Sequence, residues 1–183
     1  MNSSVSKVRI QTLTKIAICI TLLIVASYIV IPLPFSPVVI TAQTLIVNVI
    51  ALVLTPKQAF AAMGVYLFAG LIGLPVFSGG VSGPAKLFGP TGGFLIGFWV
   101  AVVVISLLKG KRPSFWRYLL VTVCVGLPII DFFGVLFMCI LQQATIPAAL
   151  MAAVVPFLPG DILKAVVACL LAVALNRVLP AND

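Results

Sequence analysis

The chain has 183 residues, of which 63% are hydrophobic and 8% are charged, and its formal net charge is +8. Soluble domains are about 45 to 50% apolar and about 25% charged, so this composition excludes a soluble globular protein and indicates an integral membrane protein. The sequence contains no histidine, which excludes imidazole metal ligands and imidazole general bases.

The length fits six membrane-spanning helices, because one span takes about 20 residues. We therefore expect an all-α integral membrane protein whose six helices form one compact bundle, with a single membrane domain over residues 1–183. The N-terminal segment carries no small-residue cleavage site and is expected to be retained. A proline-rich segment, 32–37, ends the first span, and Pro56 separates the second from the third. The predicted spans are residues 13–31, 38–54, 57–74, 94–108, 118–141 and 146–178.

Two segments interrupt this apolar pattern. Residues 73–93 include seven glycines and three prolines. They have too little apolar continuity to span, so we predict a loop or re-entrant cap between the third and fourth helices. The last span is interrupted from Pro156 to Gly160 and is predicted to resume at Asp161. Broken helices at membrane depth are tolerated where they line a cavity.

The basic residues predict the orientation. With the N- and C-termini in the cytoplasm, nine of the eleven basic residues fall on the inner side or at its interface, as the positive-inside rule requires. The two exceptions, Lys86 and Lys164, belong to the outer half and need another explanation. The nine are Lys7, Arg9, Lys15, Lys57, Lys109, Lys111, Arg112, Arg117 and Arg177.

Asp161 and Lys164 are the most informative charged residues, because the only other acids are Asp131 and Asp183. A charge at mid-membrane costs about 2.5 to 3.5 kcal/mol, whereas an i,i+3 pair returns about 0.2 to 0.5 kcal/mol. Two interpretations remain. In one, the pair lies near the outer interface, where Lys164 reaches toward water and Asp161 caps the half-helix. In the other, both side chains face a cavity and bind a polar solute.

The glycine-rich segment offers further candidates. Thr91, in Gly-Pro-Thr-Gly-Gly, is either the N-cap of the fourth span or part of a site where exposed backbone N–H groups bind a carboxylate or phosphate. Lys86 and Ser82 are possible partners for a carboxylate. No Gly-Lys-Ser/Thr follows, so the sequence does not indicate a nucleotide-hydrolysing loop on this chain.

Polar residues inside the spans are candidates with a structural alternative. Gln43 and Asn48 are expected either to hydrogen-bond other helices or, for Gln43, to reach the pocket. Asp131 is a functional candidate by default, or is held neutral by burial. The aromatic residues that are expected to form pocket walls or to pack in the core are Tyr66, Phe77, Phe88 and Phe94.

Three segments, PFSPVVITAQTL, LFAGLIGLPVFSGGVSGPAKLFGPTGGFLIGF and PFLPGDILKAVVA, resemble the signature segments of the BioY family. These are the biotin-specific substrate-binding subunits (S components) of energy-coupling factor (ECF) transporters. The resemblance covers residues from about 34 to 174 in the same order. It departs from the family at Val81-Ser82, where asparagine is frequent, and at Asp131, where an aromatic residue is expected.

The resemblance implies a prokaryotic cell membrane protein without a cofactor that binds biotin with high affinity from outside. Asp161 and Lys164 would bind the fused rings, while the biotin carboxylate would lie nearer Lys86, Ser82 or Thr91. The implied partners are an energy-coupling transmembrane subunit, docked through small residues such as Ala17 and Thr21, and ATP-binding-cassette ATPases. Together with the candidates above, the expected substrate-binding residues are Asp161, Lys164, Gln43, Tyr66, Phe77, Gly79, Gly80, Ser82, Lys86, Pro90, Thr91, Gly92 and Gly93.

Two alternative functions remain open from the sequence. One is a solitary biotin facilitator that works without ATPases. The other is an intramembrane enzyme that uses Asp131 and Asp161 as paired acids. General acid–base catalysis requires both carboxyl groups within reach of one reacting group, and these residues lie 30 positions apart on different predicted spans.

Overall fold

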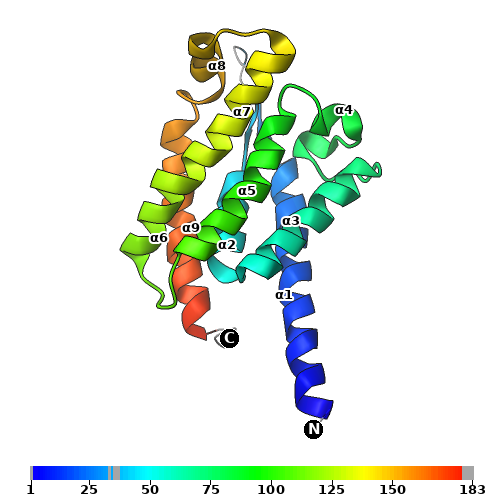
Figure 1. Cartoon of the computed structure of the whole chain (residues 1–183), viewed down its shortest axis with the longest axis vertical. Coiled ribbons are helices and arrows are strands. Elements are labelled where there is room, and N and C mark those ends of the chain that lie inside the picture. Colours follow the sequence, from blue (N-terminus) through cyan, green and yellow to red (C-terminus); the bar gives the residue numbers. More distant parts are fainter. Residues whose placement is uncertain (1, 33, 35–37, 179–183) are drawn as a thin grey trace.

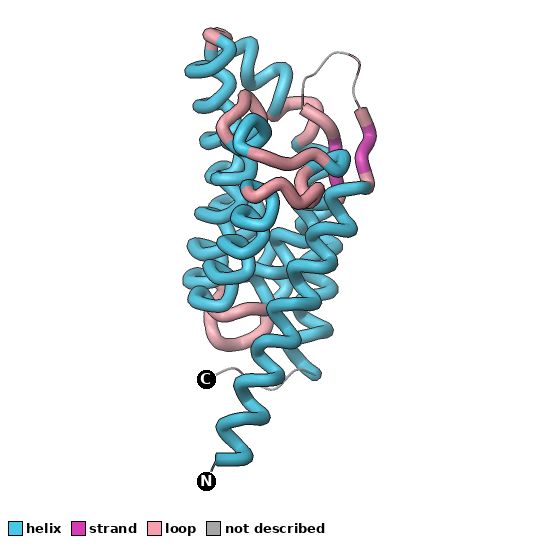
Figure 2. The backbone as a smooth tube through the Cα atoms, turned by 90° about the vertical axis from the view of Figure 1, so that its right-hand side faces the viewer, coloured by secondary structure: helices cyan, strands magenta, loops and turns pink. Residues whose placement is uncertain are grey.

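The computed structural model describes residues 2–32, 34 and 38–178, with side chains from Ile10 onward. Its helices form an elongated bundle in which both ends of the described chain lie toward the same end of the molecule (Figure 1). Figure 2 shows that the strands and most of the loop segments gather in the opposite half. Part of the predicted proline-rich turn, residues 33 and 35–37, lies outside the described residues, as does Asp183.

The secondary structure is almost entirely helical. The long helices are α1 (Asn2–Tyr28), α2 (Gln43–Val53), α3 (Pro56–Leu71), α5 (Gly92–Leu108), α7 (Leu127–Gln142) and α9 (Leu158–Val178). The shorter helical elements are η1 (Ser78–Gly80), α4 (Pro84–Leu87), α6 (Phe115–Val121), the π turn η2 (Thr122–Gly126) and α8 (Ile146–Ala153). Two short strands, β1 (Val30–Ile31) and β2 (Ile40–Thr41), pair antiparallel with Val30 opposite Thr41.

Three helical stretches of the described chain are long and apolar enough to cross a membrane: Ile10–Tyr28, Phe115–Gln142 and Leu158–Val178. They correspond to the first, fifth and last predicted spans. The helices α2 and α5 are apolar but shorter. The structure therefore supports an all-helical membrane protein, with shorter helices packed among the long ones.

The stretch Phe115–Gln142 contains a π turn just before a proline. Pro128 lacks a backbone N–H and would break a regular α-helix. The π turn η2 ends at Gly126 and widens the helix at this point. The Thr122 hydroxyl donates to the backbone oxygens of Tyr118, at 2.8 Å, and Leu119, at 3.1 Å. The span therefore continues through its proline.

The interruption of the last span differs from the prediction. The break covers residues 154–157, and α9 begins at Leu158, so Pro159 and Gly160 are helical. Proline is tolerated in the first turn of a helix, because its missing N–H would have no partner there. The Asp161 N–H donates to the Phe157 oxygen at 2.8 Å. The predictions that the helix resumes at Asp161 and that Asp161 caps it are therefore wrong.

The predicted loop 73–93 contains η1 and α4, which pack against α1 and α5 respectively. Gly79, Gly80 and Gly83 have φ angles of 76°, 73° and 90°, a region that favours glycine. The glycine content of this segment therefore allows it to fold as a compact cover.

Helix α2 lies at the centre of the bundle and packs against α9, α5 and α1. The face of α9 toward the core is made of small, fully buried residues, Ala165, Ala168, Cys169 and Ala172. Small residues allow close approach of two helices in a membrane protein. Asn48 of α2 is also fully buried, but its side-chain atoms have no hydrogen-bond partner among the described residues. The expected interhelical hydrogen bond is therefore absent at Asn48.

Lys109 satisfies the carbonyl groups at the end of α2. Its ammonium donates to the backbone oxygens of Ala51, Leu52 and Leu54 at 3.2, 2.9 and 2.5 Å. The last carbonyls of a helix have no partner within the helix, and a cation there interacts favourably with the helix dipole. Burial lowers the pKa of Lys109 to about 8, so the amine is mostly protonated at neutral pH. Lys109 therefore fastens α5 to the end of α2.

We predict that Lys109→Met lowers the free energy of unfolding by about 2 to 3 kcal/mol, because three buried carbonyl oxygens lose a charged donor. Thermal unfolding of the purified protein in detergent measures the change. Lys111→Met is the matched control, since Lys111 is exposed two positions away. Equal midpoints for the two variants would show that the Lys109 contacts contribute nothing.

Candidate functional site

A cavity of about 310 Å³ lies in the half of the bundle that carries the loops. Small-molecule sites usually occupy about 300 to 1,000 Å³. Its walls come from the strands, the glycine-rich loop and the ends of α2, α5, α7 and α9. The lining residues are Val30, Val38, Val39, Thr41, Gln43, Thr44, Ser78, Gly79, Val81, Lys86, Thr91, Phe94, Leu95, Phe98, Ile130, Asp131, Ala153, Phe157, Asp161 and Lys164.

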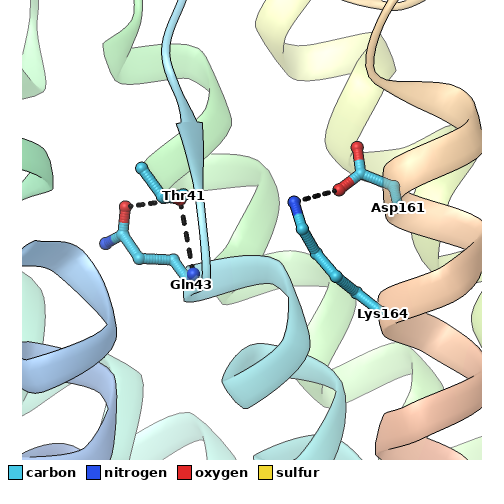
Figure 3. A network of polar contacts seen from close by, with 4 residues as sticks. All are labelled: Thr41, Gln43, Asp161 and Lys164. Carbon is cyan, nitrogen blue, oxygen red and sulfur yellow. Dashed lines mark hydrogen bonds and ion pairs between the residues drawn. The ribbon is translucent and has the colours of Figure 1, made fainter. Parts of the chain in front are cut away.

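The ion pair of α9 lies in the wall of this cavity. Lys164 Nζ is 3.0 Å from Asp161 Oδ1, and the two side chains are 17% and 15% exposed. Figure 3 shows both side chains reaching from α9 toward β2 and the start of α2. The two residues lie about one helical turn apart on α9, and most of each side chain is buried. Of the two sequence interpretations, the geometry favours the one in which the pair faces a cavity.

The opposite wall carries a hydrogen-bonded chain of polar groups. Thr41 Oγ1 donates to Gln43 Oε1 at 3.3 Å, and Gln43 Nε2 donates to Tyr66 Oη at 2.7 Å (Figure 3 shows the first contact). Tyr66 Oη in turn donates to the Val76 oxygen at 2.8 Å. This chain connects β2 and α2 to α3 and to the glycine-rich loop. Gln43 therefore both bonds another helix and lines the cavity.

Tyr66 and Phe77 pack behind the residues that form this wall of the cavity. Both are fully buried, and neither lines the cavity. Their rings pack edge to face at 5.6 Å. A side chain at Gly70 would collide with the Phe77 ring, so the Phe77 ring can pack against Tyr66 only because residue 70 is glycine. The two rings therefore support the cavity wall and are not part of its lining.

Six of the thirteen expected substrate-binding residues line the cavity: Gln43, Gly79, Lys86, Thr91, Asp161 and Lys164. Seven do not: Tyr66, Phe77, Gly80, Ser82, Pro90, Gly92 and Gly93. A side chain at Gly92 would collide with the Leu87 oxygen, and one at Gly93 with the Phe133 oxygen. These two glycines therefore serve the close packing of α5.

Lys86 and Thr91 bring polar groups from the loop to the cavity. The Lys86 ammonium has no ion pair or hydrogen bond to any residue that the structure describes, and burial lowers the pKa of its amine. Thr91 occupies the N-cap position of α5, but its side chain makes no capping hydrogen bond. Both groups are therefore available to a ligand.

Several lining residues escaped the sequence analysis. Phe94 was expected as a wall and lines the cavity, whereas Phe88 is exposed. The apolar walls also include Leu95, Phe98 and Phe157. Apolar residues carry no signal in so apolar a sequence. Asp131 lines the same cavity as Asp161, so the fold brings two residues 30 positions apart in the sequence to one cavity.

Fold and cavity together define a helical membrane protein with a partly open cavity whose walls carry both polar and apolar groups. The sequence model described as the BioY family matches residues 1–181. The chain belongs to the BioY family.

Similarity to individual proteins also supports membership of the BioY family. The chain is 38% identical over 176 residues to "Biotin transporter BioY2" of Lactococcus lactis subsp. cremoris, with 93% of each chain covered. It is 40% identical over 167 residues to "Biotin transporter BioY" of Thermotoga maritima, covering 91% of this chain and 96% of the relative. A crystal structure of the S-component for biotin from an ECF-type ABC transporter superposes with a TM-score of 0.88 at 27% identity. That match covers 97% of this chain and 95% of the other.

We predict that Tyr66→Phe lowers the free energy of unfolding by about 1 to 3 kcal/mol, because it leaves Val76 without its buried donor and Gln43 without its acceptor. Thermal unfolding in detergent is the measurement. Tyr28→Phe is the matched control, since Tyr28 Oη donates to the neighbouring Pro75 oxygen of the same loop but the residue is 54% exposed. A larger loss for Tyr28→Phe would contradict the role of Tyr66.

Proposed function

We propose that this chain is the biotin-binding membrane subunit, the S component, of an ECF-type vitamin transporter and mediates biotin uptake. The observation that carries this proposal is the placement of the Asp161–Lys164 pair in the wall of the cavity. The chain belongs to a family whose named members are biotin transporters, and its fold matches a biotin S-component.

The chemistry of biotin suits the cavity. Its ureido group presents two N–H donors and one carbonyl acceptor, which call for an acceptor and a donor side by side. Asp161 accepts from an N–H, and Lys164 donates to the carbonyl. The bicyclic ring and the alkyl chain pack on the apolar walls at Phe98 and Phe157. No cofactor takes part, and biotin is the ligand.

The biotin carboxylate is placed at the loop side of the cavity. Lys86 supplies the cation, and Thr91 supplies a hydroxyl donor. Lys86 has no partner of its own in the part of the chain that is described. An anion there would compensate the burial of its ammonium.

We further propose that the chain forms one membrane unit with six spans and cytoplasmic N- and C-termini, in the cell membrane of a prokaryote. Support comes from the two described chain ends, which lie toward the same end of the molecule (Figure 1). The connection from α5 to α6, rich in basic residues, lies toward that end as well. Positive residues concentrate on the cytoplasmic side of membrane proteins.

The proposed partners are an energy-coupling transmembrane subunit and ATP-binding-cassette ATPases, which would power transport. Ala17 and Thr21 lie on an exposed stretch of α1, and the Thr21 hydroxyl donates to the Ala17 oxygen at 2.9 Å. Exposed small residues with satisfied polar groups permit close helix contacts in a bilayer. This face is therefore suited to a helical membrane partner.

The enzyme alternative has one geometric observation in its favour, the shared cavity of Asp131 and Asp161. The named family members are transporters, and this weighs against it. A solitary facilitator would use the same cavity and differs only in its energy source.

We predict that Asp161→Asn and Lys164→Ala each weaken biotin binding by about 10- to 100-fold, because hydrogen bonds to charged groups contribute about 1.5 to 3 kcal/mol. Isothermal titration calorimetry of the detergent-purified chain measures the affinity, with thiamine and riboflavin as comparison ligands. Lys57→Ala is the control, since Lys57 is exposed and does not line the cavity. Parent-like binding by both site variants would refute this site, and saturable binding of thiamine or riboflavin in place of biotin would refute the substrate.

We predict that liposomes containing the chain alone take up no more labelled biotin than empty liposomes, because nothing drives the cavity to open inward. Adding the coupling subunit, the ATPases and internal ATP should give accumulation. Equilibration of biotin by the chain alone would favour the facilitator.

A further inference from the structure

Asp131 is a second carboxyl group in the wall of the cavity. It comes from α7, whereas Asp161 and Lys164 come from α9. The charged groups that line the cavity are therefore two acids, Asp131 and Asp161, and two bases, Lys86 and Lys164. The expected substrate-binding residues did not include Asp131.

No residue in the described part of the chain pairs with this carboxyl group. Lys164 is engaged by Asp161 at 3.0 Å, and Asp131 has no hydrogen bond or ion pair to any described residue. Asp161 lines the same cavity, so two carboxyl groups face one enclosed volume. An ionisable residue in a membrane helix is costly and usually marks a binding site. A ligand that donates to both carboxyl groups would relieve this cost.

Biotin offers two donors for two acceptors. The N–H groups of a cyclic urea lie on either side of its carbonyl and point away from each other, so one carboxylate cannot serve both. The Asp161–Lys164 pair satisfies one N–H and the carbonyl, which leaves the second N–H without an acceptor. A buried donor left unpaired costs affinity.

We propose that Asp131 accepts a hydrogen bond from the second ureido N–H of biotin, so that each N–H has its own carboxyl group. This inference rests on the proposed function, because it assigns a further contact in the same site. It makes Asp131 a residue that selects ligands with two opposed N–H donors.

The test compares two ligands on the parent chain and on Asp131→Leu and Asp131→Asn. The first ligand is biotin. The second is the analogue that carries a methyl group in place of hydrogen on the second ureido nitrogen, and therefore lacks the N–H donor assigned to Asp131 while keeping the carbonyl acceptor. Calorimetry in detergent gives both dissociation constants. Their ratio within one variant does not depend on the fraction of protein that is folded.

Biotin affinity is expected to fall about 10-fold in Asp131→Leu and less in Asp131→Asn, which keeps an amide oxygen as acceptor. The N-methyl analogue should lose no further affinity in Asp131→Leu, because it already lacks the contact that the substitution removes. Phe132→Leu is the control on the same helix, since Phe132 is 61% exposed and does not line the cavity.

Two results would overturn the inference about Asp131, and a third would refute the proposed function instead. Unchanged or tighter biotin binding in Asp131→Leu would overturn the inference, because it would make Asp131 a repelling charge beside an anionic ligand. An equal loss for both ligands would also overturn it. Failure of the parent chain to bind biotin at all would instead refute the proposed function.

Discussion

Hydrocarbon offers no hydrogen-bond partners, so a charged side chain in a membrane bundle must be satisfied by the protein or by what the protein encloses. Asp161 and Lys164 meet this constraint through their 3.0 Å contact and through the cavity that both line. Their mutual attraction is too weak to justify burying two charges. The cavity is therefore what makes this ion pair tolerable, and the surrounding elements form its walls.

Each neighbouring element contributes to that enclosure. The small residues of α9 bring this helix against α2, and the break before Leu158 starts α9 at the level of the cavity. Tyr66 connects Gln43 of the polar wall to the Val76 oxygen of the glycine-rich loop. Lys109 fixes the far end of α2. The helices around the cavity, the glycine-rich loop and the far end of α2 are therefore each fixed by specific contacts.

Much of this was predictable from the sequence, because charge is rare in it. The membrane class, the glycine-rich loop and the selection of Asp161, Lys164 and Gln43, which line the cavity, follow from polar residues in apolar surroundings. The predicted start of the last helix, Asp161, was wrong by three residues, because α9 begins at Leu158. In sequence, a proline in the first turn of a helix looks the same as a proline that breaks one. Gly92 and Gly93 are predicted ligand contacts that do not line the cavity, because a glycine needed for packing has the same appearance in sequence as one needed for a ligand.

The sequence marks Asp131 as a candidate inside a span, but it does not predict that Asp131 shares a cavity with Asp161, because this depends on how α7 packs in the bundle. The most direct test of the central claim is a high-resolution structure of the chain crystallised with biotin. The account predicts electron density in the cavity, with the ureido group against Asp161 and Lys164 and the carboxylate toward Lys86. Density for the ligand elsewhere, with an unchanged Asp161–Lys164 pair facing an empty cavity, would contradict it.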